Sequence, residues 1–474
     1  MSDILAQLTA DLEPEVASRF LELATSYLQA MEQRQGAVST PRTPAELHRR
    51  FDEPMPREGR PADEVIARLR DEVIADANHL YHPRYVGHQV SAPLPASIWT
   101  EPVIGALNQS LAVAEMSPTA TAIETRVIRW MAELVGWGPA AGGTLTSGGT
   151  EATITALLAA RARRFPDAWA RGMGGSVPVV VCGEHAHYSV ARAAGTLGIG
   201  TENVVLVPSR GWRMDVDALR STLEGLARDE RPVIAVVATA GSTATGSFDD
   251  LEAIGGLCAR HDIWLHVDGC HGASALLSPT HRERLRGVAQ AHSIAWDPHK
   301  MMLLPLSVGA LVVREERALE AAFVQKAPYL FHAGDDARIW DQGVRSAQCS
   351  RRADVIKLWV ALQRYGTDGI GALYDHLCGI AREFHRLVAE HPALEPVHTP
   401  EANILCFRWI GDGSLDQDAL DARNLEIRER YNRSGHGWIT TTVLGGRRVL
   451  RVTIMNWMTT AEDCRAIVEE IGRM

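Results

Sequence analysis

The middle of the chain alternates short apolar runs with segments of helical periodicity. Six runs rich in β-branched residues predict strands: Pro178–Cys182, Asn203–Val207, Val233–Ala238, Ile263–Val267, Ser293–Trp296 and Val308–Val313. Between several of them, apolar residues recur every three to four positions, which predicts the helices Tyr188–Leu197, Val216–Ala227 and Leu251–Arg260. Apolar strands that alternate with helices indicate an α/β fold with a mainly parallel sheet covered on both faces. Such sheets bind ligands at the carboxyl ends of their strands, so we expect the chemistry just after these runs.

Two regions with a different pattern flank this alternating core. Residues 1–80 show helical spacing except in Pro41–Pro61, where the prolines predict an extended connector, and helical spacing resumes over Val65–Leu80. After about Arg345, helical and strand-like patterns predict a smaller α+β domain: Val355–Tyr365, Ile370–Ala389, Asn403–Trp409, Leu420–Tyr431, Ile439–Leu444, Arg448–Ile454 and a last helix. We therefore divide the chain into an N-terminal helical segment (1–100), a large domain (101–345) and a small domain (346–474).

Charge and composition narrow the classes of partner. The 474 residues carry a formal net charge of −10 and no run of Lys or Arg, which disfavours a nucleic-acid partner. No stretch of 18 apolar residues occurs, so we expect no membrane-spanning helix. The N-terminal residues carry Asp3 and lack the basic and apolar regions of a secretory signal. Seven cysteines without a C-x-x-C pair are typical of a cytoplasmic protein with free thiols.

A glycine-rich segment opens one of the predicted helices. No G-x-G-x-x-G follows a strand and no P-loop motif occurs, so dinucleotide and P-loop nucleotide sites lose their main support. Instead, Thr146-Ser147-Gly148-Gly149-Thr150-Glu151-Ala152 leads into the apolar helix Thr153–Arg163. Glycines let backbone N–H groups approach an anion, and the helix N-terminus adds positive potential. The alternative is an ordinary helix start with Thr150 as the N-cap.

An acidic residue ends a predicted strand in His266-Val267-Asp268-Gly269-Cys270-His271. On an extended strand, His266, Asp268 and Cys270 point to one side. Three interpretations stay open at this point. The residues could hold a metal ion, Asp268 could be a buried paired carboxylate, or it could face a cationic ring nitrogen.

A lysine follows the next predicted strand in Asp297-Pro298-His299-Lys300. The chain has only three lysines, and Lys300 alone follows a strand in apolar company, Met301–Leu304. Burial lowers the pKa of a lysine and makes its amine a nucleophile for carbonyls, although a surface lysine is the commoner case. An anion cradle, an acid and a lysine on neighbouring strands match the needs of pyridoxal 5′-phosphate (PLP).

These motifs resemble those of the PLP-dependent group II amino-acid decarboxylases, in the branch of glutamate, cysteine-sulfinate and diaminobutyrate decarboxylases. The resemblance extends from His82-Pro83-Arg84-Tyr85 to about Arg451, and its motifs come in the family's order. Besides the three segments above they are Ala186-His187-Tyr188-Ser189, the run from Ala238 to Thr243, Tyr329-Leu330-Phe331 and the run from Gln348 to Arg352. The resemblance implies fold type I of the PLP enzymes, like aspartate aminotransferase, and a homodimer with the active site at the subunit interface.

The resemblance also implies a role for each matching residue. Lys300 would bind the cofactor covalently and Asp268 would pair with its ring nitrogen. The other cofactor contacts would be Ser147, Gly148 and Gly149 at the phosphate, His299 beside it, His187 stacked on the ring, and Thr239 and Cys270 next to the ring. Tyr329 would lie on a loop that closes over the partner's site and donates a proton, and Arg451 would bind a substrate carboxylate.

The chain departs from the family pattern at two places beside the expected ring site. Gly269-Cys270-His271 stands where Ala-Ala-Trp or Ala-Ala-Tyr is usual, and Asp297 stands where Asn is common. Neither change removes a chemical group that the reaction requires. Both affect the expected shape of the substrate site more than the expected reaction.

The expected activity is α-decarboxylation of an L-amino acid to an amine and carbon dioxide. A small acidic substrate such as glutamate, aspartate or cysteine sulfinate is favoured, because Arg451 can form a bidentate pair with a carboxylate or sulfinate. Diaminobutyrate or an aromatic amino acid is the alternative substrate, since the diaminobutyrate branch shares Asn108-Gln109-Ser110 and Ser117-Pro118. An aldehyde-forming decarboxylase, an aminotransferase and a non-catalytic PLP-fold protein are the other classes considered. With PLP as cofactor, no metal is expected.

Overall fold

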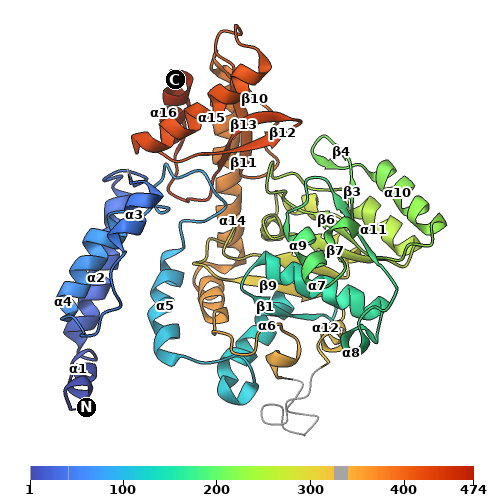
Figure 1. Cartoon of the computed structure of the whole chain (residues 1–474), viewed down its shortest axis with the longest axis horizontal. Helices are drawn as coiled ribbons and strands as arrows, with labels where there is room; N and C mark the ends of the chain where they lie inside the picture. The colour runs from blue at the N-terminus through green and yellow to red at the C-terminus, as the bar shows by residue number, and fades with distance from the viewer. Residues whose placement is uncertain (1, 41, 325–339) are drawn as a thin grey trace. The chain divides into compact units, whose positions relative to one another are not determined.

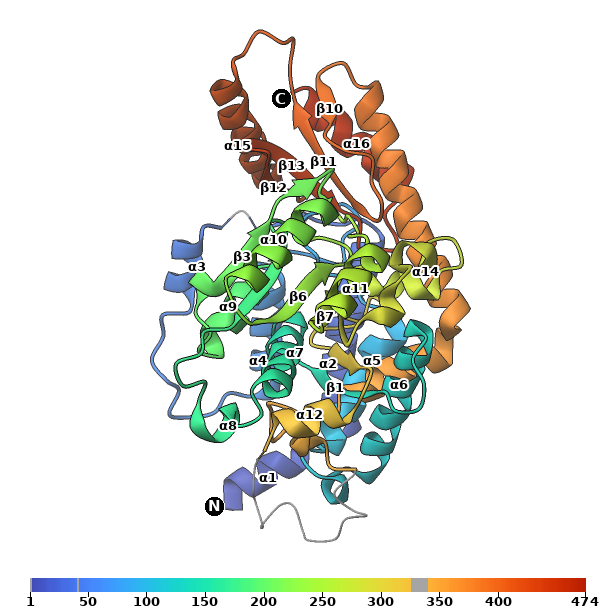
Figure 2. The same ribbon diagram turned by 90° about the vertical axis from the view of Figure 1, so that its right-hand side faces the viewer.

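A computed structural model describes residues 2–40, 42–324 and 340–474. The chain forms two compact units, drawn in Figure 1 and, turned by 90°, in Figure 2. The larger unit comprises Gln89–Arg382 and His398–Leu405, and the smaller unit comprises Met1–His88, Glu383–Val397 and Cys406–Met474. The division at residues 100 and 345 stays a prediction from the sequence.

A seven-stranded sheet in the order β1-β9-β8-β7-β6-β2-β3 is the framework of the larger unit. Its strands are β1 (Gly142–Thr146), β2 (Val179–Gly183), β3 (Val204–Val207), β6 (Val233–Thr239), β7 (Trp264–Asp268), β8 (Ser293–Trp296) and β9 (Gly309–Val313). Only β9 runs antiparallel to its neighbours β8 and β1, and the other pairs are parallel. The mainly parallel sheet and all six strands expected from the sequence are therefore confirmed.

Strand β1 is absent from the sequence prediction. Its sequence, Gly-Gly-Thr-Leu-Thr, has too few apolar side chains to give a strand signal, although all five residues are buried. Packing explains the glycines, because a Cβ on Gly143 would lie 2.2 Å from the carbonyl oxygen of Leu311 in β9.

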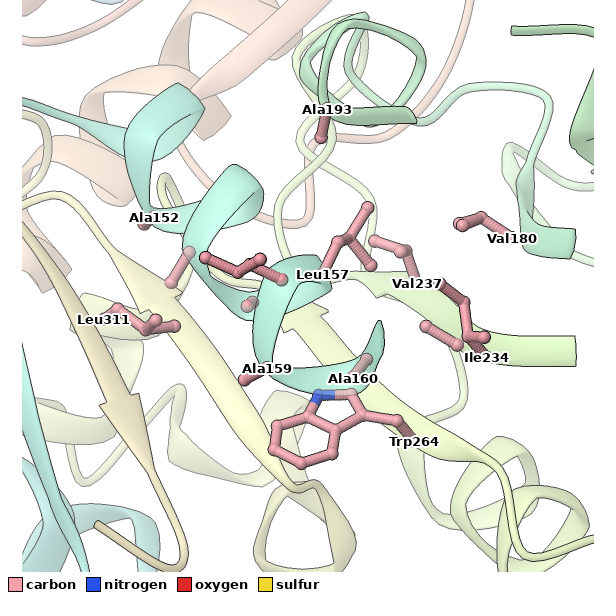
Figure 3. Packing of buried hydrophobic residues seen from close by; sticks show 14 of the residues in the cluster. Ala152, Leu157, Ala159, Ala160, Val180, Ala193, Ile234, Val237, Trp264 and Leu311 are labelled. Atoms are coloured by element: carbon pink, nitrogen blue, oxygen red, sulfur yellow. The ribbon is translucent and has the colours of Figure 1, made fainter. Parts of the chain in front are cut away.

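Helix α7 (Gly149–Arg164) packs across this sheet. It contacts β1, β6, β7, β8 and β9 and the helices α9 (Ser189–Thr196) and α12 (Arg317–Ala322). Figure 3 shows Ala152, Leu157 and Ala160 of α7 among apolar side chains of the strands, with Val237 and Leu311 labelled. Small residues let the helix approach the strands closely, and truncating the fully buried Leu157 to Ala would cost about 2–5 kcal/mol. This tight packing fixes the N-terminus of α7 beside the end of β1.

The remaining elements of the larger unit include the two helices predicted over Val216–Ala227 and Leu251–Arg260, and others that the sequence analysis did not predict. They are α5 (Pro95–Leu107), α6 (Pro118–Val135), α8 (Ala168–Arg171), α10 (Val216–Arg228), α11 (Leu251–Arg260), the hairpin β4 (Ser209–Arg210) and β5 (Arg213–Met214), and short 3-10 turns at Ala114–Met116, Thr201–Asn203, Ala273–Leu277, Arg282–Leu285, Val288–Gln290 and Gln342–Val344. The chain passes into the smaller unit within α14 (Val355–Glu390). Gly366 has non-helical dihedral angles (φ 66°, ψ 170°) and interrupts α14, as the prediction of two successive helices requires.

The smaller unit combines both ends of the chain. Its elements are α1 (Ser2–Ala10), α2 (Pro14–Glu32), α3 (Pro44–Arg50), α4 (Ala62–Arg68) with a π-helical turn (Leu69–Ile74), α15 (Gln417–Ser434) and α16 (Ala461–Gly472). A four-stranded sheet has the order β10-β11-β13-β12, formed by Leu394–Pro396, Ile404–Trp409, Arg447–Thr453 and Thr440–Leu444. Asp463 of α16 joins the N-terminal segment through ion pairs with Arg34 at 2.8 Å and Arg84 at 3.2 Å.

The expected connector Pro41–Pro61 is wrong in part, because α3 lies inside it. Thr43 and Glu46 cap each other's backbone N–H groups, and Pro44 occupies the first helical turn, where its missing N–H costs nothing. The helical spacing expected to continue to Leu80 ends at Ile74. Among the described residues, no helix combines the length and hydrophobicity needed to span a membrane.

Candidate active site

The carboxyl ends of five strands of the larger unit surround one cavity of about 340 Å³. Segments that follow β1, β2, β6, β7 and β8 line it, as expected for a mainly parallel sheet. The lining residues are Ser147, Gly148, Gly149, Thr150, His187, Ser189, Thr239, Gly241, Thr243, Asp268, Cys270, His271, Asp297, His299, Lys300 and Leu306. Nine of the eleven site residues predicted from the sequence therefore share this cavity.

The glycine-rich loop between β1 and α7 forms one end of the cavity. Helix α7 begins at Gly149 and its N-cap is Gly148, so Thr150 as an N-cap is wrong. Gly148 has φ +153°, which disfavours any side chain, and a Cβ on Gly149 would lie 2.2 Å from Cys270 Sγ. The loop thus brings its backbone close to the cavity, and the first N–H groups of the helix have no partner within the helix. Ser147 donates from N and Oγ to Glu151 Oε2 at 2.8 and 2.7 Å.

Lys300 lies on the turn after β8, with Asp297 beside it. Its Nζ is 3.1 Å from Asp297 Oδ2. Burial by itself lowers the pKa of Lys300, but the charges of Asp297 and Asp268 outweigh it and raise the pKa above its ordinary value. The lowered lysine pKa expected from burial is therefore wrong here, because two carboxylates lie near the amine. No sequence pattern indicates this arrangement.

Asp268 is the last residue of β7, and its carboxylate faces the cavity. Oδ1 accepts a hydrogen bond from Cys270 N at 3.3 Å. Burial raises the pKa of Asp268, but the charge of Lys300 and the Cys270 hydrogen bond lower it overall, so the group is ionised at neutral pH. Burial raises the pKa of the Cys270 thiol well above its usual range, so this side chain lines the cavity as an uncharged thiol.

Two histidines of the cavity are neutral for the same reason, because burial lowers the pKa of both His187 and His299. Ser189 N donates to His187 Nδ1 at 3.3 Å, and Val308 N donates to His299 Nδ1 at 3.0 Å. In each ring the proton is therefore assigned to Nε2. Thr239, at the end of β6, completes the wall and donates its N–H to Asp249 Oδ2 at 2.7 Å.

Two predicted site residues are not placed at this cavity. Tyr329 lies outside the described residues. Arg451 lies in β13, an interior strand of the sheet of the smaller unit. Its guanidinium is buried and donates to Gly87 O and Thr440 Oγ1, both at 3.4 Å, and burial lowers its pKa.

The cavity also contains residues to which the sequence analysis gave no role. His271 Nε2 lies 2.7 Å from Asn403 Oδ1, and Asp297 contacts both Lys300 and the glycine loop. Their place directly after β7 and β8 is the signal that could have included them. His266 does not line the cavity and its Nδ1 lies 2.9 Å from Ser293 Oγ. The described residues contain no cluster of three metal-ligating side chains.

Comparison with known proteins decides the family. Residues 44–410 match the model of the pyridoxal-dependent decarboxylase conserved domain. The chain belongs to this family. It is therefore a PLP-dependent amino-acid decarboxylase, as the resemblance in the sequence implied.

Individual relatives agree with this assignment. L-2,4-diaminobutyrate decarboxylase of Rhizobium meliloti (strain 1021) is 34% identical over 427 residues, 89% of this chain and 83% of that protein. Human cysteine sulfinic acid decarboxylase is 32% identical over 447 residues, 91% of this chain and 90% of that protein. The crystal structure of mouse CSAD in apo form has a TM-score of 0.91 and 26% identity, covering 96% and 98% of the two chains. The fold is thus the expected fold type I.

The residues of the cavity fit PLP. Gly148 and Gly149 line the cavity without side chains, and a Cβ on Gly148 would lie 3.3 Å from the His299 ring, so the glycines leave room for a phosphate to approach backbone N–H groups. Asp268 is an ionised carboxylate that lines the cavity, which suits a protonated ring nitrogen. The neutral His187 offers an uncharged aromatic face, and Lys300 supplies the amine.

Proposed function

We propose that the enzyme performs α-decarboxylation of an L-amino acid at this cavity, with an acidic side chain favoured. The convergence of Lys300, Asp268 and the Gly148–Gly149 loop on one cavity carries this proposal. When bound, PLP supplies an electron sink for the electron pair left on Cα after the carboxylate departs. The carboxylate leaves as carbon dioxide, and one proton takes its place on Cα.

Each predicted site residue has a proposed role in binding the cofactor or the substrate. Lys300 would bond to its aldehyde carbon with loss of water, and Ser147, Gly148 and Gly149 would hold its phosphate with His299 beside them. Asp268 holds a proton on the ring nitrogen, because a buried carboxylate stabilises a nearby cation. His187 would stack on the ring, and Thr239 and Cys270 would contact it from the cavity wall. Tyr329 donates the proton to Cα, and Arg451 binds a substrate carboxylate.

The acidic substrate is favoured because the guanidinium of Arg451 can donate two parallel hydrogen bonds to a carboxylate or sulfinate. The relationship to a cysteine sulfinic acid decarboxylase over 90% of that protein supports it. Diaminobutyrate is the second candidate, supported by the 34% identical relative that acts on it. Two carboxylates, Asp268 and Asp297, line the cavity and also suit a cationic side chain.

A panel of L-amino acids, including cysteine sulfinate and diaminobutyrate, tests the reaction with the holoenzyme. Carbon dioxide, amine, ammonia and keto acid are measured in parallel. We expect amine and carbon dioxide in equal amounts. Keto acid without carbon dioxide would identify an aminotransferase, and aldehyde with ammonia would identify an aldehyde synthase.

Competition distinguishes the two substrate classes. We expect dicarboxylates to inhibit and Arg451→Lys to weaken substrate binding several-fold, because Lys keeps the charge and loses the two-pronged geometry. Inhibition by diamines alone, with an unaffected Arg451→Lys enzyme, would assign the diamino substrate.

We also propose that the enzyme is a homodimer in which the Tyr329 loop of one subunit serves the site of the other. The family resemblance supports this arrangement. A cytoplasmic location stays a prediction from the cysteine content.

A further inference from the structure

The carboxylate of Asp297 occupies the anion-binding loop itself. Its Oδ2 accepts the N–H of Gly149 at 3.2 Å and lies 3.1 Å from Lys300 Nζ and 3.6 Å from His299 Nε2. Its Oδ1 is buried and has no hydrogen-bond partner among the described residues. The carboxylate of Asp297 thus already accepts a hydrogen bond from Gly149 N, one of the donors that we assign to the phosphate.

Asp297 has little room to leave this position. The residue is only 2% exposed, and a Cβ on Gly309 of β9 would lie 2.7 Å from Oδ1, so the backbone closes the opposite side. The other carboxylate at the loop, Glu151, differs in this respect. Glu151 is half-buried, bonds Ser147 and accepts from Gln348 Nε2 at 2.6 Å, away from Gly149.

A phosphate bound at the loop would therefore meet a fixed carboxylate. Two anions that share a desolvated site repel each other, and the usual resolution is that one proton is retained between them. The oxygen Oδ1, which lacks a partner, gives that proton a place on Asp297, from which it can be donated to a phosphate oxygen.

We propose that binding of the cofactor's phosphate takes up one proton, held between the phosphate and Asp297, so that the enzyme binds its cofactor more tightly as the pH falls. This inference rests on the proposed cofactor site. With one proton taken up on binding, the phosphate-dependent part of the affinity weakens by up to about tenfold for each pH unit that the pH rises. The titratable groups that share the cavity with Asp297 are Lys300 and His299 on its own turn, Asp268 at the end of β7, Cys270 after β7, and His187 after β2.

Two probes isolate the phosphate. Pyridoxine 5′-phosphate and pyridoxine differ only in that group, and neither carries the aldehyde that bonds to Lys300. Their dissociation constants are measured from ligand fluorescence with cofactor-free wild type, Asp297→Asn and Asp354→Asn between pH 6 and 9. Asp354 is the matched control, because it pairs with Lys357 at 3.0 Å with the same three-residue spacing and does not line the cavity.

We expect Asp297→Asn to bind pyridoxine 5′-phosphate at least about tenfold more tightly than wild type at pH 8, with the gain shrinking toward pH 6. Binding of pyridoxine should change less than threefold, and Asp354→Asn should behave like wild type. Equal gains for both ligands, or none for the phosphate ester, would overturn the proposal.

Calorimetry of the wild type in two buffers of different ionisation enthalpy tests the proposal without a variant. Binding of the phosphate ester should take up close to one proton more than binding of pyridoxine at pH 8, and no difference would contradict the proposal.

Borohydride trapping of PLP on Lys300 separates failure of this inference from failure of the proposed cofactor site. Trapping there with no effect of Asp297 rejects only this inference, whereas trapping elsewhere rejects the site itself.

Discussion

At the residue scale, the charge states of the cavity are set by neighbours on different strands. Asp268 on β7 and Lys300 after β8 favour each other's ionised form, and burial keeps His187, His299 and Cys270 neutral. The site thus holds one lysine cation against two carboxylates. This arrangement suits a cofactor that brings an anionic phosphate at one end and a cationic ring nitrogen at the other.

Replacing Asp268 tests its role at the ring nitrogen. We expect Asp268→Asn to lower kcat by on the order of 100-fold, because an amide cannot hold the ring proton by charge. Cofactor content should fall much less, since Lys300 and the loop remain. Asp249→Asn is the control, as Asp249 is buried but accepts only the N–H groups of Met214 and Thr239. Near-normal turnover of Asp268→Asn would remove Asp268 from the reaction.

The sequence could indicate that Lys300 and Asp268 share a cavity because each directly follows a predicted strand, and its glycines singled out the loop before α7. It could not give the pKa direction of Lys300, because the contact with Asp297 depends on how the turn after β8 folds. Arg451 shows the same limit, since its place on an interior strand of the smaller sheet follows from strand pairing and not from the local sequence.

At the element scale, the junction of β1 and α7 decides whether the cavity can accept a phosphate. The strands with β-branched runs were predictable, whereas β1 was not, because glycines and threonines form it under the constraint of β9. Helix α3 was also missed, because the prolines around it predicted an extended connector. In the structure, its capping residues stabilise a helix despite these prolines.

A pair of substitutions tests the close approach at this junction. Gly149→Ala would place its Cβ 2.2 Å from Cys270 Sγ, so we expect PLP affinity to fall at least about tenfold. Cys270→Ala removes that sulfur, and the double variant should recover most of the affinity. PLP titration monitored by absorbance measures both. Gly138→Ala is the control, because a Cβ added at Gly138 would have nothing within 4 Å. A double variant as weak as Gly149→Ala would contradict this account.

At the scale of the whole molecule, the two ends of the chain meet in the smaller unit. Asp463 of α16 pairs with Arg34 and Arg84 and caps its own helix with Thr460. Burial raises the pKa of Asp463, but the hydrogen bonds of Arg34 and Thr460 lower it to about 2. Because this lies below the ordinary value, the ionised carboxylate stabilises the fold fully above about pH 4 and loses that effect as the pH falls toward 2.

We expect Asp463→Asn to lower the free energy of unfolding by about 1–3 kcal/mol, equally at pH 7 and pH 5. Urea denaturation followed by tryptophan fluorescence measures it, and below pH 4 the difference from wild type should shrink. Glu469→Gln, at an exposed pair with Arg473 on the same helix, should change stability by less than about 0.5 kcal/mol. Equal effects of the two substitutions would show that the link between the chain ends carries no special stability.

The proposed dimer predicts complementation between two inactive subunits. Lys300→Ala lacks the proposed cofactor lysine, and Tyr329→Phe lacks the proposed proton donor. Refolding them together should restore about a quarter of the wild-type rate of amine formation, because half of the dimers are mixed and each has one intact site. Light scattering should give twice the chain mass of 51.7 kDa. Amine formation no greater than the sum of the separate variants would place Tyr329 at its own subunit's site or outside the reaction.

We propose above that PLP bonds to Lys300 in the cavity at the strand ends. The most direct measurement is borohydride reduction of the holoenzyme followed by peptide mass spectrometry. With only three lysines in the chain, the assignment is unambiguous. We predict the reduced cofactor on the peptide that contains Lys300. Its appearance on Lys326, or on Lys357, which is fully buried and paired with Glu101 and Asp354, would contradict the account.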